Sequence, residues 1–523
     1  MTCPLPNRRD DAVTFTMELR SGWAKSLIIT KVQWSSRPAA IRRFGGAKLG
    51  RNPMSLHTHL SRRNLLAGAA GTLAFATADR IAAQGGKPNI VFILADDLGF
   101  ADVSCYGQRD YTTPNIDRLA LEGMRFIQAY SNSPDCSATR TALISGRYQY
   151  RLPVGLEEPI VPTTPKNIGL PPSHPTLPSV LKKAGYSTTL VGKWHLGFLP
   201  DFSPLKSGYD HFFGIFGGSA DYFNHGSKSS APLYEGEVPV DRVGYMTNLL
   251  GDRAVKTIEG YAKSKEPFLL SLHFTAPHWP WEGPDDEAES KRIKGRLRHY
   301  DGGTQKTYMA MIQSLDANIG RVLQALDVQG LSGNTIVIFT SDNGGERFSK
   351  VWPFSGMKSE LLEGGLRIPA IVRWPDRVAA GSVSEQVMIS MDWMPTLLAA
   401  AGTQMDPAYP ADGENLLPTL TSRSVPRPRK LYWRFKAGAQ RAVREGDWKY
   451  LRIAGNEFLF DVVKDPRERA NYKDREKDVF TRLKTDWETW NSTILPERSR
   501  PATYENTGEL VADHYGVTNP KIE

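Results

Sequence analysis

One segment of the chain constrains its fold more than any other. Residues 89–95 (Asn-Ile-Val-Phe-Ile-Leu-Ala) form an almost wholly apolar run that ends abruptly in two aspartates. A strand with one face in water alternates apolar and polar residues, whereas a strand buried on both faces of a parallel sheet does not. Residues 268–274 and 335–340 repeat the design, and residues 308–326 between them carry apolar residues at helical spacing. The sequence therefore predicts an α/β fold with a mainly parallel central sheet sandwiched by helices.

The pattern changes after residue 400. A segment containing Pro and Gly, residues 402–426, leads into short strand patterns and one amphipathic helix. The strands are expected at residues 430–435, 440–444, 448–453 and 457–461, with a hairpin turn at 445–447, and the helix at 478–490. We therefore expect a catalytic domain over residues 87–400 and a smaller C-terminal α+β subdomain with an antiparallel sheet over residues 401–523.

The bulk properties of the chain exclude two classes of protein. The formal charge of +9 resides in residues 1–83, which carry 13 Lys and Arg against 4 Asp and Glu. The remainder is neutral on balance and lacks the basic footprint of a nucleic-acid-binding domain, so no nucleic-acid partner is expected. Three cysteines in 523 residues are too few for a disulfide scaffold, and the fold must rest on its hydrophobic core.

The N-terminal region has the pattern of a targeting segment. Residues 54–83 contain Arg62-Arg63 followed by a short run of Ala, Gly and Leu, which resembles a bacterial twin-arginine export signal. The run is too short and too rich in Gly to span a bilayer, so no stable membrane insertion is expected. We therefore expect a periplasmic or secreted protein. Residues 1–53 have no role ahead of such a signal, and we interpret them as a mis-called extension before a true start at Met54.

Polar residues follow each of the three apolar strand patterns. They are Asp96 and Asp97 after the first, His278 after the second, and Asp342 and Asn343 after the third. Sites in parallel sheets form beyond the carboxyl ends of the strands. Three carboxylates and an amide oxygen that converge there suit Ca²⁺ or Mg²⁺, and the absence of a His and Cys cluster argues against structural zinc.

Cationic and proton-transferring residues lie in turns rich in Gly and Trp. Lys193 and His195 belong to the segment Gly-Lys-Trp-His-Leu-Gly at residues 192–197, and Lys358 precedes Glu-Gly-Gly-Leu-Arg at residues 363–367. Lysine and histidine beside a metal ion can bind an anionic group and protonate a leaving oxygen. These residues extend the predicted site from metal binding to catalysis.

Seven motifs in one order resemble the type I sulfatase family of the alkaline phosphatase superfamily. They are Asp96-Asp97, residues 113–126, Cys136-Ser-Ala-Thr-Arg140 with Ser145-Gly-Arg147, residues 192–197, Ala276-Pro-His278, residues 341–345, and Lys358 with Glu363-Gly-Gly. The resemblance covers about residues 88–370 and continues more weakly through the C-terminal subdomain. Ala138 stands where many members have proline, and the family tolerates both residues.

The resemblance implies a role for each site residue. Cys136 would be oxidised to formylglycine (3-oxoalanine) by a formylglycine-generating enzyme, and its hydrate would attack sulfur with one hydroxyl and expel sulfate with the other. The implied Ca²⁺ ligands are Asp96, Asp97, Asp342, Asn343 and the modified Cys136. Arg140 and Lys193 would steady the hydrate and His195 would assist its collapse. His278 and Lys358 would bind sulfate and help the ester oxygen leave, and Ser219 would contact the substrate.

These implications favour a secreted, calcium-dependent hydrolase of aryl or carbohydrate sulfate esters, with Mg²⁺ as the other possible metal. Residues 214–225 and 352–354 most resemble the arylsulfatase branch that includes N-acetylgalactosamine-4-sulfatase, which indicates a sulfated sugar. Two alternatives stay open. One is a phosphonate or phosphate monoester hydrolase on the same scaffold, and the other is a non-catalytic binder of sulfated glycans in which Cys136 is never converted.

Overall fold

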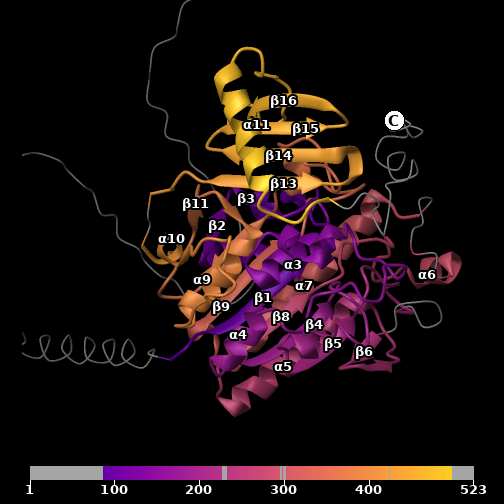
Figure 1. Ribbon diagram of the computed structural model, residues 1–523. Helices are drawn as coiled ribbons and strands as arrows, with labels where there is room; N and C mark the ends of the chain where they lie inside the picture. The colour runs from indigo at the N-terminus through magenta and orange to yellow at the C-terminus, as the bar shows by residue number, and fades with distance from the viewer. Residues whose placement is uncertain (1–85, 226–232, 295–296, 298–301, 423–424, 498–523) are drawn as a thin grey trace, which may run out of the picture. The chain divides into compact units, whose positions relative to one another are not determined.

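The computed structural model describes residues 86–225, 233–294, 297, 302–422 and 425–497 (Figure 1). The predicted export signal and the predicted extension lie outside the described residues. No helix in the described part of the chain is both long enough and apolar enough to cross a membrane.

The largest sheet has ten strands in the order β11-β2-β10-β9-β1-β8-β4-β5-β6-β7. Their bounds are β1 Asn89–Ala95, β2 Met124–Phe126, β4 Ser187–Lys193, β5 His211–Ile215, β6 Leu233–Glu235, β7 Val238–Val240, β8 Phe268–His273, β9 Thr335–Ser341, β10 Ala370–Arg373 and β11 Ser382–Ser384. The central strands β9, β1, β8, β4 and β5 are parallel, and β10, β6 and β7 run antiparallel to their neighbours. The three strands predicted from apolar runs are confirmed as β1, β8 and β9.

Helices cover both faces of this sheet because the side chains of a continuous apolar strand alternate between them. Val91 and Ile93 of β1 belong to one core, with α2 (Pro114–Glu122), α5 (Met246–Ser264) and α7 (Gln305–Val328). Phe92 and Leu94 belong to the other, with α3 (Cys136–Ser145), α4 (Leu177–Lys183) and α9 (Trp393–Ala400). The predicted helical sandwich is confirmed, and the helix expected at residues 308–326 is α7.

The shorter elements complete the fold. A two-stranded parallel sheet pairs β3 (Ala129–Tyr130) with β12 (Met388–Ile389), and three short helices are α6 (Glu287–Ile293), α8 (Glu363–Leu366) and α10 (Leu417–Ser422). The sequence missed α10, which lies inside the segment expected to be a linker. Leu416 and Leu420 explain the difference, because they bury their side chains in the core shared with α9.

The C-terminal sheet is antiparallel, as predicted, with the strand order β13-β14-β15-β16. Its elements are β13 Lys430–Phe435, β14 Gln440–Glu445, β15 Trp448–Ile453, β16 Asn456–Asp461 and the helix α11 Lys477–Asn491. The expected hairpin turn joins β14 to β15, and Gly446 supplies the positive φ of 58° that such a turn needs. The exact domain boundary near residue 400 stays a prediction.

Buried polar contacts join the C-terminal sheet to the segments around β3 and α8. Trp433 of β13 donates from its indole N–H to the carbonyl of Ser131 at 2.9 Å. The Nζ atom of Lys449 lies 2.9 Å from carboxylate oxygens of both Glu363 and Glu468, and all three side chains are fully buried or nearly so. Because Glu363 begins α8, this ion network fixes the segment that immediately follows Lys358 in the chain.

Removal of Lys449 should therefore be costly. The Lys449→Ala substitution leaves two buried carboxylates without their shared cation, and we expect it to lower the free energy of unfolding by about 3–5 kcal/mol. The matched control is Lys430→Ala in the same sheet, which removes partly exposed ion pairs with Glu445 and Asp486 and should cost at most about 1 kcal/mol. Urea denaturation measures both, and equal losses would contradict the prediction.

Candidate active site

Four adjacent parallel strands bring their carboxyl ends to one edge of the large sheet. β9, β1, β8 and β4 lie side by side in that order. The polar residues at these ends are those that the sequence predicted, namely Asp342 and Asn343 after β9, Asp96 and Asp97 after β1, His278 beyond β8, and Lys193 as the last residue of β4. Side chains that are far apart in the sequence therefore meet at one place.

Asp97 is the centre of this group. Its backbone N–H donates to Oδ1 of Asp342 at 3.2 Å, and its Oδ1 accepts a hydrogen bond from Nδ2 of Asn343 at 2.7 Å. Its Oδ2 accepts a hydrogen bond from Nζ of Lys358 at 2.6 Å. Asp97 also has a φ of 60°, a conformation that non-glycine residues seldom adopt. The contacts that hold this strained backbone position are thus contacts with the other predicted site residues.

Two further cations satisfy the remaining carboxylates. Nζ of Lys193 lies 2.6 Å from Oδ2 of Asp96. Arg140 directs both Nε and a terminal nitrogen to Oδ2 of Asp342 at 2.9 Å, and the same terminal nitrogen lies 3.7 Å from Oδ1 of Asp96. The described site therefore opposes three carboxylates with three fixed cations, all of them buried.

The charge pairing sets the ionisation of these groups. Burial opposes ionisation of Asp342, yet Arg140 and Lys193 hold the pKa of its carboxyl below the ordinary value. Burial likewise opposes the charge of Lys358, yet the carboxylate of Asp97 holds the pKa of the lysine well above its ordinary value. Asp342 therefore stays ionised and Lys358 protonated at neutral pH.

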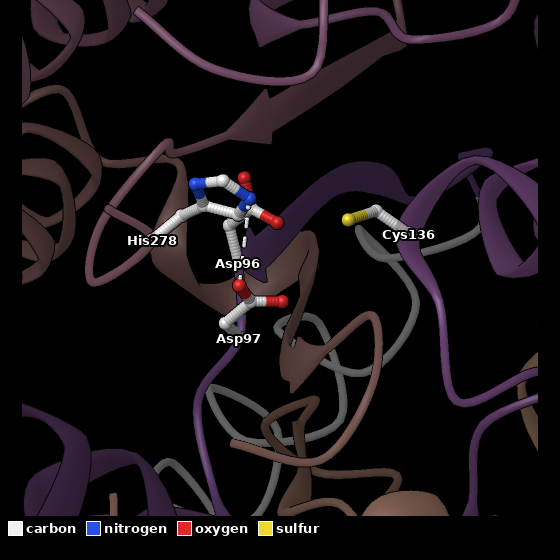
Figure 2. A group of neighbouring side chains, drawn as sticks. All are labelled: Asp96, Asp97, Cys136 and His278. Atoms are coloured by element: carbon white, nitrogen blue, oxygen red, sulfur yellow. Dashed lines mark ion pairs between the residues drawn. The ribbon is translucent and has the colours of Figure 1, made fainter. Parts of the chain in front are cut away.

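Cys136 begins α3, and its side chain points toward the two aspartates (Figure 2). One ligand atom from each of Asp96, Asp97, Cys136 and His278 lies within 4.8 Å of the others. The amino end of α3 adds a positive field at this point, and every residue of the helix is buried. Burial raises the pKa of the Cys136 thiol well above its ordinary value, which differs from the activated thiolate of a cysteine nucleophile.

Two buried oxygen atoms of the site are available as ligands for a hard cation. Oδ1 of Asp96 and Oδ1 of Asn343 have no hydrogen-bond partner among the described residues. A buried polar atom without a partner is costly, and oxygen atoms of carboxylates and amides are the ligands that Ca²⁺ and Mg²⁺ prefer. The predicted donor set therefore fits such an ion.

The two histidines of the site are held as neutral imidazoles. Nε2 of His195 lies 2.7 Å from the carbonyl of Ile160, while its Nδ1 is buried without a hydrogen-bond partner. Nδ1 of His278 lies 2.6 Å from the carbonyl of Trp279, which leaves Nε2 directed at Oδ2 of Asp97, 3.5 Å away. Burial, and next the charge of a neighbouring lysine, lower the pKa of both rings well below the ordinary value.

Ser219 lies on a loop that passes His195. A Cβ atom added to the preceding Gly218 would come within 2.7 Å of Nε2 of the imidazole, so the backbone and the ring are in close approach. Ser219 itself is half-buried. The structure thus places the serine beside the cluster, whereas the other predicted side chains belong to it.

Sequence analysis missed a pair of carboxylates behind these loops. Asp221 follows Ser219, and Glu282 follows His278 by four residues; both are fully buried. Oδ1 of Asp221 accepts hydrogen bonds from the backbone of Phe223 and from Ser290, and Oε2 of Glu282 accepts one from the N–H of Tyr222. No local motif reveals such a pair, because its two members are distant in sequence and meet only in the fold.

The fold and the site together define a class of protein: an α/β enzyme that handles an anionic ester at a buried cluster of carboxylates and cations. The Sulfatase family model matches residues 88–403, and a second model, N-sulphoglucosamine sulphohydrolase, C-terminal, matches residues 357–492. The chain belongs to the sulfatase family and is a sulfuric ester hydrolase.

Individual relatives agree with the family. Mouse (Mus musculus) arylsulfatase J is 31% identical over 477 residues, which cover 79% of this chain and 77% of that protein. Mouse N-acetylgalactosamine-6-sulfatase is 34% identical over 385 residues, which cover 69% of this chain and 71% of that protein. The crystal structure of Ps i-CgsB in complex with k-i-k-neocarrahexaose matches with a TM-score of 0.70 at 30% identity, over 81% of this chain and 96% of that one. The predicted fold class and enzyme class are confirmed.

The buried pair of Asp221 and Glu282 should make the free energy of unfolding depend on pH. Burial, and next the carboxylate of Asp221, raise the pKa of Glu282 from 4.5 to about 8. The proton on Glu282 therefore contributes stability that is complete below pH 4.5 and is lost as the pH rises to about 8. In Glu282→Gln the side chain stays neutral and can still accept from Tyr222, so its free energy of unfolding should be close to that of wild type near pH 5 and larger above about pH 8.

Thermal unfolding measured across this pH range checks the prediction. The control is Glu259→Gln, which changes an exposed glutamate on α5 and should not alter the pH dependence. A difference between Glu282→Gln and wild type that stays constant with pH would contradict the assignment.

Proposed function

We propose that this sulfatase hydrolyses a carbohydrate sulfate ester with Cys136, oxidised to formylglycine, as the source of the nucleophile and with Ca²⁺ as its metal ion. The observation that carries the proposal is the position of Cys136. Its Sγ lies with carboxylate and imidazole ligand atoms in one group within 4.8 Å, at the buried start of α3. A hydrated aldehyde at this position would supply a hydroxyl nucleophile that can be regenerated.

Asp96, Asp97, Asp342 and Asn343 would hold the ion together with the modified Cys136. When bound, Ca²⁺ would act as a Lewis acid toward the sulfate oxygens. The unpartnered oxygens of Asp96 and Asn343 support this ligand set. Mg²⁺ prefers the same donors and is the second candidate.

The remaining residues of the proposed site bind, orient and transfer protons. Arg140 and Lys193 would fix the two carboxylates closest to them and steady the hydrate of residue 136. His195 has a free lone pair on Nδ1, which would accept a hydroxyl proton as sulfate is expelled. Lys358 is held protonated beside Asp97 and would donate to the ester oxygen as it leaves, with His278 on the sulfate and Ser219 on the substrate.

The names of the relatives support a sulfated sugar as the substrate. N-acetylgalactosamine-6-sulfatase acts on a sulfated sugar by its name, and Ps i-CgsB was solved with an oligosaccharide bound. A phosphate or phosphonate ester would contact the same cations. The alternative function, hydrolysis of such an ester, would therefore use the same site and differ only in which ester is hydrolysed faster. The alternative of a non-catalytic glycan binder is disfavoured because the chain has the expected residue at every proposed catalytic position.

Maturation is part of the proposal. Cys136 is only 2% exposed in the folded chain, so a formylglycine-generating enzyme would have to act before folding is complete. Export to the periplasm or beyond by the twin-arginine route, which carries folded proteins, would then follow. The residues that would direct export lie outside the described part of the chain.

The main test compares sulfate and phosphate esters and removes the nucleophile. Purified enzyme should release sulfate from a galactose sulfate and from 4-nitrophenyl sulfate faster than phosphate from 4-nitrophenyl phosphate. Cys136→Ala should lower the sulfatase rate by at least about 10³-fold, because it removes the covalent step. The matched control is Cys105→Ala, which changes the other described cysteine and should keep most of the activity.

Mass spectrometry of tryptic peptides completes this test. The peptide that contains residue 136 should carry an aldehyde and the peptide that contains residue 105 a thiol. An unmodified Cys136 in active enzyme would refute the formylglycine mechanism, and a faster phosphatase rate would favour the rival.

Metal removal gives a second test with a readout independent of activity. A ligand that binds only the folded state stabilises it by about 2.7 kcal/mol at a concentration of 100 Kd. Chelation should therefore lower both Tm and activity, and added Ca²⁺ should restore both, more effectively than Mg²⁺. Asn343→Ala should raise the Ca²⁺ concentration needed for half-maximal stabilisation by about 10-fold or more, whereas the exposed control Asn456→Ala should not. A Tm that does not respond to Ca²⁺ would exclude the metal site.

A further inference from the structure

Asp135 stands immediately before Cys136, and none of the roles above uses it. It is the N-cap residue of α3, a position at which Asp ordinarily accepts a hydrogen bond from an N–H of the first helical turn. Here its side chain makes no capping hydrogen bond. The backbone carbonyl of Asp135 accepts from the N–H of Thr139, and the Thr139 hydroxyl exchanges hydrogen bonds with the backbone of Ser133. The Asp135 carboxylate therefore takes no part in these contacts at the helix start.

The carboxylate has no other partner either. Oδ1 of Asp135 is buried without a hydrogen bond, and among the described residues the side chain makes no hydrogen bond and no ion pair within 4.0 Å, although it is only 3% exposed. The three carboxylates of the metal cluster, by contrast, each have a cation or an amide in direct contact. Burial of a charged group without partners is costly, and proteins seldom tolerate it unless a ligand completes the site.

The surroundings of Asp135 place it beside the residue proposed as the nucleophile and beside the segment that carries Lys358. Burial raises the pKa of the Asp135 carboxyl to about 6, and the next largest influences are the charges of Lys358, Asp97, Lys193 and Lys436, of which the first three are site residues. The segment is fixed there, since the N–H of Ser359, next to Lys358, donates to the carbonyl of Pro134 at 2.9 Å. Glu158 is a further acidic group within electrostatic reach.

We propose that Asp135 determines specificity by accepting a hydrogen bond from a donor group beside the sulfate ester, such as the hydroxyl on the adjacent ring carbon of a sugar. An ionised carboxylate can only accept hydrogen bonds, so its partner must be a donor. The same charge repels a second sulfate or a carboxylate at that carbon, so the enzyme selects a sugar whose neighbouring position is an unmodified hydroxyl. The inference rests on the proposed sulfatase activity and adds to it the chemistry of the group next to the ester.

The test compares three substrates in wild type and three variants. The probes are the galactose monosulfate that wild type hydrolyses fastest, its analogue deoxygenated at the adjacent carbon, and 4-nitrophenyl sulfate, which has no such hydroxyl. Wild type should prefer the hydroxyl-bearing sugar over its deoxy analogue by about 10- to 100-fold in kcat/KM. Asp135→Ala should bring these two values together while leaving the rate on 4-nitrophenyl sulfate nearly unchanged.

Two variants keep the result interpretable. Asp135→Asn retains an acceptor without the charge, so it should keep part of the preference for the hydroxyl and accept a second sulfate at the adjacent carbon better than wild type does. Asp201→Ala removes an exposed aspartate from a distant loop and should behave as wild type. All rates are divided by the aldehyde content of residue 136, because Asp135 is its neighbour and could affect conversion.

The outcomes separate the inference from the function on which it rests. Equal losses on all three probes in Asp135→Ala would overturn the specificity role and assign the residue to the nucleophile or the fold. An unchanged preference in Asp135→Ala would overturn it as well. Wild type that hydrolyses none of the sulfates would instead overturn the proposed function, and the inference with it.

Discussion

The site depends on one electrostatic constraint, the burial of three carboxylates at the ends of parallel strands. Asp96, Asp97 and Asp342 are each at most 2% exposed, and carboxylates at such depth remain ionised only beside cations or hydrogen-bond donors. Each cation that answers this need comes from a different element: Arg140 from α3, Lys193 from the end of β4, and Lys358 from the loop before α8. The charge requirement of the sheet edge thus ties together segments that the chain order keeps apart.

A second set of buried charges links the C-terminal sheet to the segment that follows Lys358. Lys358 lies on a loop, and a loop positions a side chain loosely unless the structure around it is fixed. The beginning of α8, a few residues later, is held by Lys449 and Glu468 of the C-terminal segment through contacts of 2.6–2.9 Å. The C-terminal subdomain therefore holds the segment of Lys358 through α8 and through the side chain of Gln440, which accepts from the N–H of Leu361 and donates to the carbonyl of Ser359.

Local patterns explain which features could be predicted from the sequence. Strands β1, β8 and β9 are apolar throughout because both faces are buried, and the polar residues that follow them meet because parallel strands end at the same edge. The helix α10 was missed because only tertiary burial of Leu420 identifies it within a stretch containing Pro and Gly. The sequence also could not reveal the pair of Asp221 and Glu282, because its members meet only in the folded chain. The same holds for Asp135, whose missing capping hydrogen bond can be seen only in the structure.

The proposed metal ion would give the site its preference for an anion. Three carboxylates lie beside three cations, and burial lowers the pKa of the two histidines and raises the pKa of the Asp96 carboxyl. A divalent cation beside the oxygens of Asp96 and Asn343 that lack hydrogen bonds would add two positive charges to the cluster, and in a poorly solvated site these charges act strongly on a sulfate group. Asp135 lies beside this cluster, and its Oδ1 is buried without a hydrogen bond. With the proposed metal ion bound, one side of the site would favour the ester anion, while the proposed role of Asp135 would disfavour a second anion, so that the two together would orient a substrate with a single sulfate beside a hydroxyl.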